Sequence, residues 1–211
     1  MAFTGKNLLL YAVTERYPDR DFFAQIESAL KGGITCLQLR EKHLPFDEFL
    51  AEAREVKKLC AKYSVPLIIN DNTGIALESG AGGVHIGQDD GDIAEVRKIA
   101  GNRLIIGVSA HNVEEALAAE KAGADYLGSG AVFGSATKSS VHTLPLETLK
   151  NICSSVKIPV VAIGGINETN IMRLAGTGID GVAVISAIFG AEDIKSKCLM
   201  LKKFSEKVTG I

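Results

Sequence analysis

Charged and amide side chains follow the ends of several short apolar runs in this chain. Gln38-Leu-Arg-Glu-Lys42 closes one run, Asn70-Asp71 the next, and Gly87-Gln-Asp-Asp90 and Ser109 follow two later ones. A guanidinium and an ammonium can hold phosphate oxygens, the first in a bidentate manner and the second as a point charge. Carboxylates without a nearby cysteine or histidine pair are ligands that favour Mg²⁺ over zinc. The spacing therefore predicts a phosphate or diphosphate site with a divalent cation.

Segment 128–140 combines glycines and hydroxyl side chains with one cation, Lys138. Such a loop can bring several backbone N–H groups close to an anion. Gly164-Gly165 and Ser186 follow two later apolar runs and predict a second phosphate site built from backbone N–H groups. Plainer interpretations stay open at this point, namely a flexible surface connection for 128–140 and a tight turn at the two glycines.

Each charged candidate also has a structural alternative. Arg40 and Lys42 could form surface ion pairs with Glu41, and such pairs contribute little to stability. Asp71 and the aspartates at 89, 90 and 92 could cap or flank helix N-termini. His85 lies inside an apolar run and is interpreted as a hydrogen-bonded core residue, and no nucleophile–base pair is visible.

The apolar runs are too short for helices, and segments of helical period separate them. Nearly uninterrupted apolar strands alternating with helices are typical of a parallel sheet covered by helices. About eight such units in 211 residues predict an α/β fold, a single (β/α)₈ TIM barrel over 1–211, whose active face is the C-terminal ends of the strands. The expected strands are 8–13, 36–39, 66–69, 83–86, 104–108, 124–127, 159–163 and 181–185, with helices at 168–175 and 191–207 among those between and after them.

Composition narrows the class of protein. A net charge of −2 without a Lys/Arg cluster gives no basic surface for nucleic acid, and segment 8–13 is too short to span a membrane. The four cysteines lie far apart with no C-x-x-C pair, so we expect reduced, mostly buried thiols in a cytoplasmic protein.

Taken in order, the motifs resemble the thiamine-phosphate synthase family over nearly the whole chain. They are Gln38-Leu-Arg-Glu-Lys42, Ile69-Asn-Asp71, Gly83-Val-His-Ile-Gly-Gln-Asp-Asp90, Ile106-Gly-Val-Ser-Ala-His111, Thr137-Lys138, Ala162-Ile-Gly-Gly-Ile166 and Gly181-Val-Ala-Val-Ile-Ser-Ala-Ile188. The resemblance implies a transferase that joins 4-amino-2-methyl-5-(diphosphooxymethyl)pyrimidine to 4-methyl-5-(2-phosphooxyethyl)thiazole, using Mg²⁺ and releasing diphosphate. Its partners would be these two small molecules, without nucleic acid or membrane, and homo-oligomerisation stays open.

The resemblance also implies roles for individual residues. The metal would lie on Asp71 and Asp90, and the catalytic residues would be Arg40, Lys42, Ser109 and Lys138. The pyrimidine diphosphate would contact Gln38, Leu39, Arg40, Glu41, Lys42, Asn70, Ser109 and Lys138, and the thiazole phosphate would contact Ser135, Ala136, Thr137, Gly165, Ile185 and Ser186. The implied order is departure of diphosphate, then attack of the thiazole nitrogen on a pyrimidine-methyl cation, which requires charge neutralisation rather than a base.

The chain departs from the family pattern in 128–140. The family usually has prolines where this chain has Ala131 and Gly134, and a threonine where it has Ser135. Two alternatives therefore stay open. A thiazole tautomerase shares the fold, but it carries a histidine in place of Ala131 and lacks the aspartates. A non-catalytic barrel that binds a phosphorylated metabolite is the other.

Overall fold

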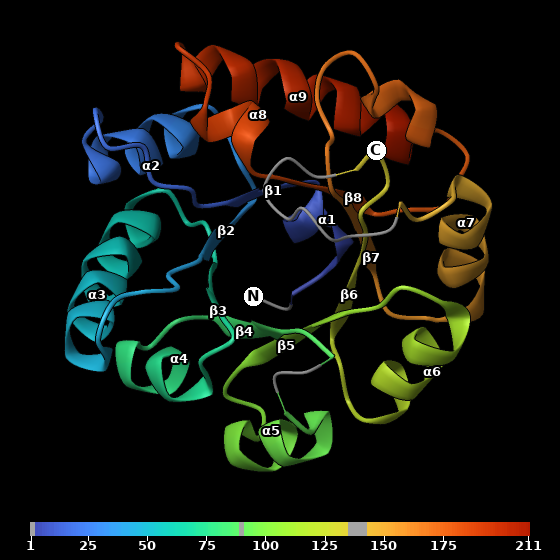
Figure 1. Cartoon of the computed structure of the whole chain (residues 1–211), viewed down its shortest axis with the longest axis horizontal. Coiled ribbons are helices and arrows are strands. Elements are labelled where there is room, and N and C mark those ends of the chain that lie inside the picture. Colours follow the sequence, from blue (N-terminus) through green and yellow to red (C-terminus); the bar gives the residue numbers. More distant parts are fainter. Residues whose placement is uncertain (1–2, 89–90, 135–142) are drawn as a thin grey trace.

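Eight parallel strands close into a barrel in the order β1 to β8, as the prediction required (Figure 1). The computed structural model describes residues 3–88, 91–134 and 143–211. The strands are β1 (Leu10–Val13), β2 (Cys36–Leu39), β3 (Leu67–Asn70), β4 (Gly83–Ile86), β5 (Ile105–Ser109), β6 (Tyr126–Gly130), β7 (Val160–Ile163) and β8 (Gly181–Val184).

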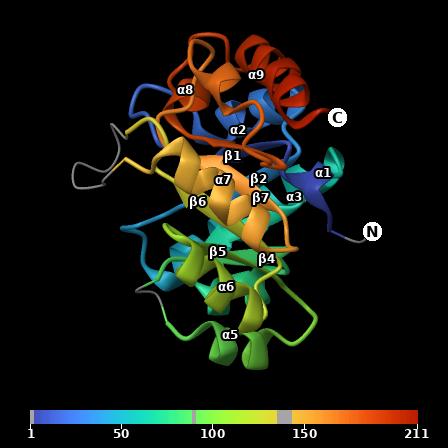
Figure 2. The same cartoon turned by 90° about the vertical axis from the view of Figure 1, so that its right-hand side faces the viewer.

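Helices surround this barrel on the outside, one or more after nearly every strand (Figures 1 and 2). They are α1 (Gly5–Leu8), α2 (Phe22–Lys31), α3 (Phe46–Lys62), α4 (Thr73–Ser79), α5 (Ile93–Ala100), α6 (Val113–Lys121), α7 (Leu146–Ser155), the 3₁₀ helix η1 (Ile171–Leu174), α8 (Ser186–Phe189) and α9 (Ile194–Thr209). The short α1 precedes β1 and lies across the N-terminal end of the barrel, which leaves the opposite end for a site.

Two layers of apolar packing explain why the strands read as nearly continuous apolar runs. Alternate strand residues such as Tyr11, Cys36 and Tyr126 fill the barrel interior, and the intervening ones such as Leu37 and Leu39 pack outward against the helices. Both faces of each strand are buried, as expected when helices cover a parallel sheet. The inward positions at the C-terminal ends of the strands are therefore the ones that can carry polar side chains into a site.

Several predicted boundaries are wrong, each for a local reason. β1 begins at Leu10, not at residue 8, because Thr4 and Asn7 form a capping box for α1. β6 continues through Gly130, so the first three residues of segment 128–140 are strand. In place of the helix predicted over 168–175 there is only η1, and α9 begins at Ile194, where Asp193 accepts a hydrogen bond from Ser196 N.

The cysteines agree with the expectation of free, mostly buried thiols. All four are free, and three of them, Cys36, Cys60 and Cys198, are buried. Within the described ranges, no helix has the length and apolar character needed to cross a membrane.

Candidate active site

The first half of the candidate site lies at the C-terminal ends of β2, β3 and β5. Gln38 is inward-facing and only 5% exposed, whereas Arg40 is half-buried and Lys42 is exposed in the segment that follows β2. Asn70 ends β3 and Ser109 ends β5, both half-buried. Because all strands are parallel, these residues share the open end of the barrel.

Contacts of neighbouring groups hold the segment after β2, and among the described residues none of them pairs its two cations with a carboxylate. The backbone N–H of Arg40 donates to Thr14 Oγ1 at 2.9 Å, which fixes the chain just after the strand. Neither Arg40 nor Lys42 forms an ion pair with a carboxylate in the described part of the chain. Glu41 instead pairs with Arg16 at 2.9 Å. The alternative that Arg40 and Lys42 pair with Glu41 therefore finds no support.

Arg16 was not singled out from the sequence, although its ion pairs hold the segment after β2, which forms the rim of the barrel there. Its guanidinium pairs with both Glu41 and Glu52, and it stacks 4.0 Å over the ring of Phe22. Burial, opposed by Arg16, leaves the pKa of Glu52 above its ordinary value. Two carboxylates that share one guanidinium tie α3 to the segment carrying Arg40 and Lys42, so Glu41 is positioned as a structural partner of Arg16.

The side chain of Leu39 lies apart from the open end of the barrel, which we call the mouth. This side chain is fully buried in the outer layer between barrel and helices, so only the backbone of Leu39 is placed to contact a substrate.

Asp71 follows β3 with an exposed carboxylate and a backbone φ of 61°. Left-handed backbone is uncommon outside glycine, and Asp and Asn tolerate it best. The capping alternative fails for this residue because Asn72 is the N-cap of α4 and accepts from Ile75 N at 2.9 Å. For Asp92 the same alternative is confirmed, since its side chain accepts from Ala94 N at the start of α5. The side-chain amide of Asn70 donates to Asp71 Oδ2.

This donor set fits a Mg²⁺ ion that is completed by substrate. Mg²⁺ keeps several waters and binds through one or two carboxylates plus substrate phosphates rather than in an all-protein cage. Asp71 supplies one exposed carboxylate at the mouth, and no cluster of three or more His, Cys, Asp or Glu side chains gathers among the described residues. The chemistry of Asp71 therefore suits an ion that shares phosphate oxygens.

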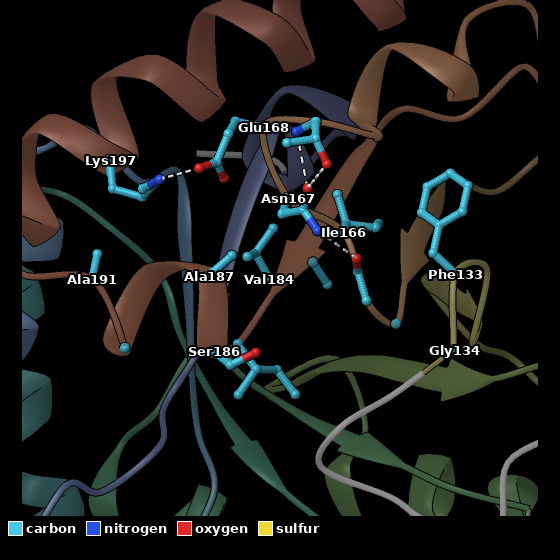
Figure 3. Close-up of a pocket in the computed structure, with 16 residues that line it drawn as sticks. Phe133, Gly134, Ile166, Asn167, Glu168, Val184, Ser186, Ala187, Ala191 and Lys197 are labelled. Atoms are coloured by element: carbon cyan, nitrogen blue, oxygen red, sulfur yellow. Dashed lines mark hydrogen bonds and ion pairs between the residues drawn. The ribbon is translucent and has the colours of Figure 1, made fainter.

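The second half of the site is a cavity of about 650 Å³ at the ends of β7 and β8 (Figure 3). Gly165, Ile185 and Ser186, three of the residues expected at the thiazole phosphate, all line it. Ser186 and Ala187 begin α8, and N–H groups in the first turn of a helix have no carbonyl partner within that helix. The cavity thus offers backbone donors to an anion.

Gly165 is required at this position by its backbone and by its neighbours. Its φ is 68°, and a Cβ placed there would approach Gly134 O to 2.6 Å and Phe133 O to 2.7 Å. Asn167 and Asn170 both donate side-chain N–H groups to the Gly165 carbonyl, at 3.2 and 2.9 Å. The segments after β6 and β7 are therefore in close contact. The backbone of Gly164-Gly165 agrees with the tight-turn interpretation. A tight turn here is compatible with a role in binding.

Lys197, the cation of this cavity, is already neutralised. It reaches from α9 to Glu168 in the segment after β7, with Nζ and Oε1 2.6 Å apart (Figure 3). This contact lowers the pKa of Glu168. The cavity therefore differs from the rim at β2, where the cations lack carboxylate partners among the described residues.

Five predicted site residues, Asp90, Ser135, Ala136, Thr137 and Lys138, lie outside the described residues. Their assigned roles stay predictions.

Sequence reasoning also missed a polar group inside the barrel. Tyr11 and Tyr126 are fully buried, and their hydroxyls are 2.8 Å apart. His85 contacts Tyr126 and Ser109, which confirms its interpretation as a hydrogen-bonded residue. A signal was present in Gly107, a strand glycine whose missing Cβ leaves room for the Tyr126 ring.

The fold and the site together define a (β/α)₈ barrel with its candidate site at the C-terminal ends of the strands. The family model described as "Thiamine monophosphate synthase" matches residues 10–188. The chain belongs to this family.

Named relatives agree with this assignment. The "Thiamine-phosphate synthase" of Clostridium acetobutylicum is 50% identical, with 91% of this chain and 92% of that protein covered. "Thiamine-phosphate synthase 2" of Streptococcus pneumoniae is 47% identical, with 90% of this chain and 91% of that protein covered. A solved structure titled thiamine phosphate pyrophosphorylase, from Pyrococcus furiosus, superposes with a TM-score of 0.90 at 42% identity, over 97% of this chain and 98% of that one.

Proposed function

We propose that this chain condenses the diphosphate of a hydroxymethylated aminopyrimidine with a thiazole phosphate, releasing diphosphate and forming thiamine phosphate. The family assignment supports this reaction as a transferase reaction of thiamine biosynthesis. One observation carries the assignment of the site. Arg40, Lys42 and Asp71 lie at the same end of the barrel as the cavity lined by Gly165 and Ser186.

Two substrates that must react with one another need two sites at one mouth. Arg40 and Lys42, without carboxylate partners among the described residues, are suited to the more highly charged diphosphate. The cavity at β7 and β8 is suited to the single phosphate, since it offers backbone donors and a Lys197 already paired with Glu168. Holding both molecules in one geometry removes part of the entropic cost of a bimolecular step.

Bond breaking and bond making are then both supported by residues of this chain. As the bond between the methylene carbon and the bridging oxygen breaks, the electron pair stays on the departing diphosphate. Arg40 and Lys42 stabilise that developing charge, and we assign the same role to Lys138. The lone pair of the thiazole nitrogen then forms the new bond to the methylene carbon. Gln38, Asn70 and Ser109 orient the pyrimidine, and no general base is needed.

We assign Mg²⁺ to Asp71 and Asp90. When bound there, the ion supplies neutralisation of charge on the diphosphate oxygens.

The test is release of diphosphate by the purified protein. With both phosphorylated substrates and Mg²⁺, we expect diphosphate and thiamine phosphate in equal amounts. Leaving out the thiazole phosphate, or removing Mg²⁺ with EDTA, should abolish thiamine phosphate. Binding of the thiazole phosphate without diphosphate release would favour a non-catalytic barrel, and interconversion of thiazole tautomers would favour a tautomerase.

A further inference from the structure

A chain of hydrogen bonds crosses the interior of the barrel and joins two residues of the mouth. Gln38 Nε2 donates to Tyr11 OH at 2.7 Å, and Tyr11 OH lies 2.8 Å from Tyr126 OH. The chain continues through His85, whose Nδ1 is 3.0 Å from Tyr126 OH and whose Nε2 is 3.1 Å from Ser109 Oγ. The five residues come from β2, β1, β6, β4 and β5, so the chain runs from one side of the barrel to the other (Figure 1).

The surrounding packing is built to admit this chain. A Cβ at Gly107 would lie 2.1 Å from Cζ of Tyr126, and one at Gly128 would lie 3.0 Å from Cε1 of His85. Two inward strand positions thus carry glycine where the tyrosine and imidazole rings need the space. Tyr11 and Tyr126 are almost completely excluded from solvent, and burial raises the pKa of both hydroxyls well above the ordinary value. Both therefore act as neutral phenols.

The first contact fixes the direction of all the others. The amide Nε2 of Gln38 can only donate, so Tyr11 accepts from it and gives its own proton to Tyr126. Tyr126 accepts from Tyr11, and among the described residues its own proton has Nδ1 of His85 as the remaining acceptor, so pairing this buried proton requires an unprotonated Nδ1. A neutral imidazole with an acceptor Nδ1 carries its proton on Nε2, and that N–H donates to Ser109 Oγ.

We propose that this one-way chain holds His85 as the neutral Nε2–H tautomer and makes Ser109 a hydrogen-bond donor toward the substrate. Ser109 Oγ accepts from His85, and no other hydrogen bond of this hydroxyl occurs among the described residues. Its proton is consequently directed to a ligand. Tyr11, Tyr126 and His85 are positioning residues, because they act through Gln38 and Ser109.

The consequence, which rests on the proposed function, is selection of the ring form of the pyrimidine. A 4-aminopyrimidine has unprotonated ring nitrogens that accept the Ser109 proton. A 4-oxopyrimidine carries a proton on one of its ring nitrogens, and if Ser109 faces that nitrogen it meets a second donor and its own proton loses its partner. Sites that bind by directed hydrogen bonds reject such analogues strongly, because buried polar groups are left unpaired.

The direction of the chain can be measured without any turnover. In protein labelled with ¹⁵N at histidine, long-range ¹H–¹⁵N correlation spectra distinguish the Nδ1–H, Nε2–H and charged forms. The protein has four histidines, and the His85→Gln variant identifies the His85 signals by removing them. We expect a pyrrole-type Nε2 and a pyridine-type Nδ1 at neutral pH. A charged ring or the Nδ1–H form in the wild-type protein would overturn the proposal.

The role of the chain is tested with Tyr126→Phe, which removes one oxygen and breaks the connection to Nδ1. We expect His85 to lose its single tautomer, and the preference for the 4-amino over the 4-oxo diphosphate substrate, measured as the ratio of kcat/KM values, to fall by about tenfold. Tyr63→Phe is the matched control, since Tyr63 OH donates to Glu27 on the outer surface at 3.0 Å. That variant should keep both the tautomer and the preference.

Two further results keep this proposal separate from the proposed reaction. If Tyr126→Phe keeps the wild-type tautomer and preference while folding normally, the chain does not set the polarity of Ser109. If the wild-type protein releases no diphosphate from either substrate, the reaction is wrong, and the ¹⁵N spectra still decide the direction of the chain.

Discussion

The two halves of the mouth present charge in opposite ways. At β2 and β3 the groups that we assign to substrate and metal binding are charged side chains, namely Arg40, Lys42 and Asp71. At β7 and β8 they are mainly backbone groups around Gly165 and Ser186, and the nearby Lys197 is neutralised by Glu168. The difference suits the chemistry we propose, because charge develops on the departing diphosphate and not on the thiazole phosphate. Loss of one of these three charged groups should therefore reduce kcat, and losses at the second half should mainly raise KM.

The largest effect is expected for Asp71→Asn. Asn tolerates the φ of 61° as Asp does, so this change removes charge with little backbone strain. We expect kcat for diphosphate release to fall by about 10²-fold or more, the scale for losing one partner of transition-state charge. Asp47→Asn, an exposed change in the first turn of α3, is the control and should keep kcat within twofold. A fall of less than threefold for Asp71→Asn would make the residue structural.

The second largest effect is expected for Gly165→Ala, which tests the half of the mouth at β7 and β8, where backbone groups line the cavity. The added methyl group would collide with the carbonyls of Phe133 and Gly134 and would have to move the segments that line the cavity. We expect KM for the thiazole phosphate to rise about tenfold, with KM for the pyrimidine diphosphate within twofold.

Gly176→Ala is the matched control for that change. Gly176 also has a positive φ, 79°, but nothing lies within 4 Å of the position of its Cβ. Both variants therefore carry a similar backbone strain of about 1–2 kcal/mol, and only the first has the collision. If Gly165→Ala and Gly176→Ala change KM for the thiazole phosphate equally, Gly165 matters for stability and not for the cavity.

The same comparison shows what the sequence can and cannot predict. Apolar runs separated by helical segments were sufficient for the barrel, and strand ends such as Asn70-Asp71 and Gly164-Gly165 marked the mouth. The sequence could not predict which of two adjacent residues caps α4, and the N-cap is Asn72 and not Asp71. Long-range partners were missed as well. Tyr11 and Tyr126 are 115 residues apart, and no local pattern shows that their hydroxyls meet.

A smaller effect is expected for Arg16→Ala. The change releases Glu41 and leaves Glu52 half-buried without its partner, so the segment carrying Arg40 and Lys42 loses its support from α3. We expect KM for the pyrimidine diphosphate to rise about fivefold, with less change in KM for the thiazole phosphate. Because Arg16→Lys keeps one charge but loses the planar fork, its effect should be intermediate. Unchanged KM values in Arg16→Ala would separate this ion-pair group from the site.

The smallest effect should come from Lys197→Met at the cavity. Its charge is used by Glu168, so KM for the thiazole phosphate should rise by less than threefold, and the loss in unfolding free energy at pH 7 should be about 0.5 kcal/mol. The pKa of Glu168 is lowered in the folded protein, so the stabilisation is present above the ordinary pKa of 4.5 and disappears as the pH falls through the lower, folded value. Urea unfolding of wild type and variant should therefore differ at pH 7 and converge as the pH falls below the folded pKa of Glu168. A rise in KM of tenfold or more would mean that Lys197 binds the phosphate directly, and the contrast between a side-chain half and a backbone half would fail.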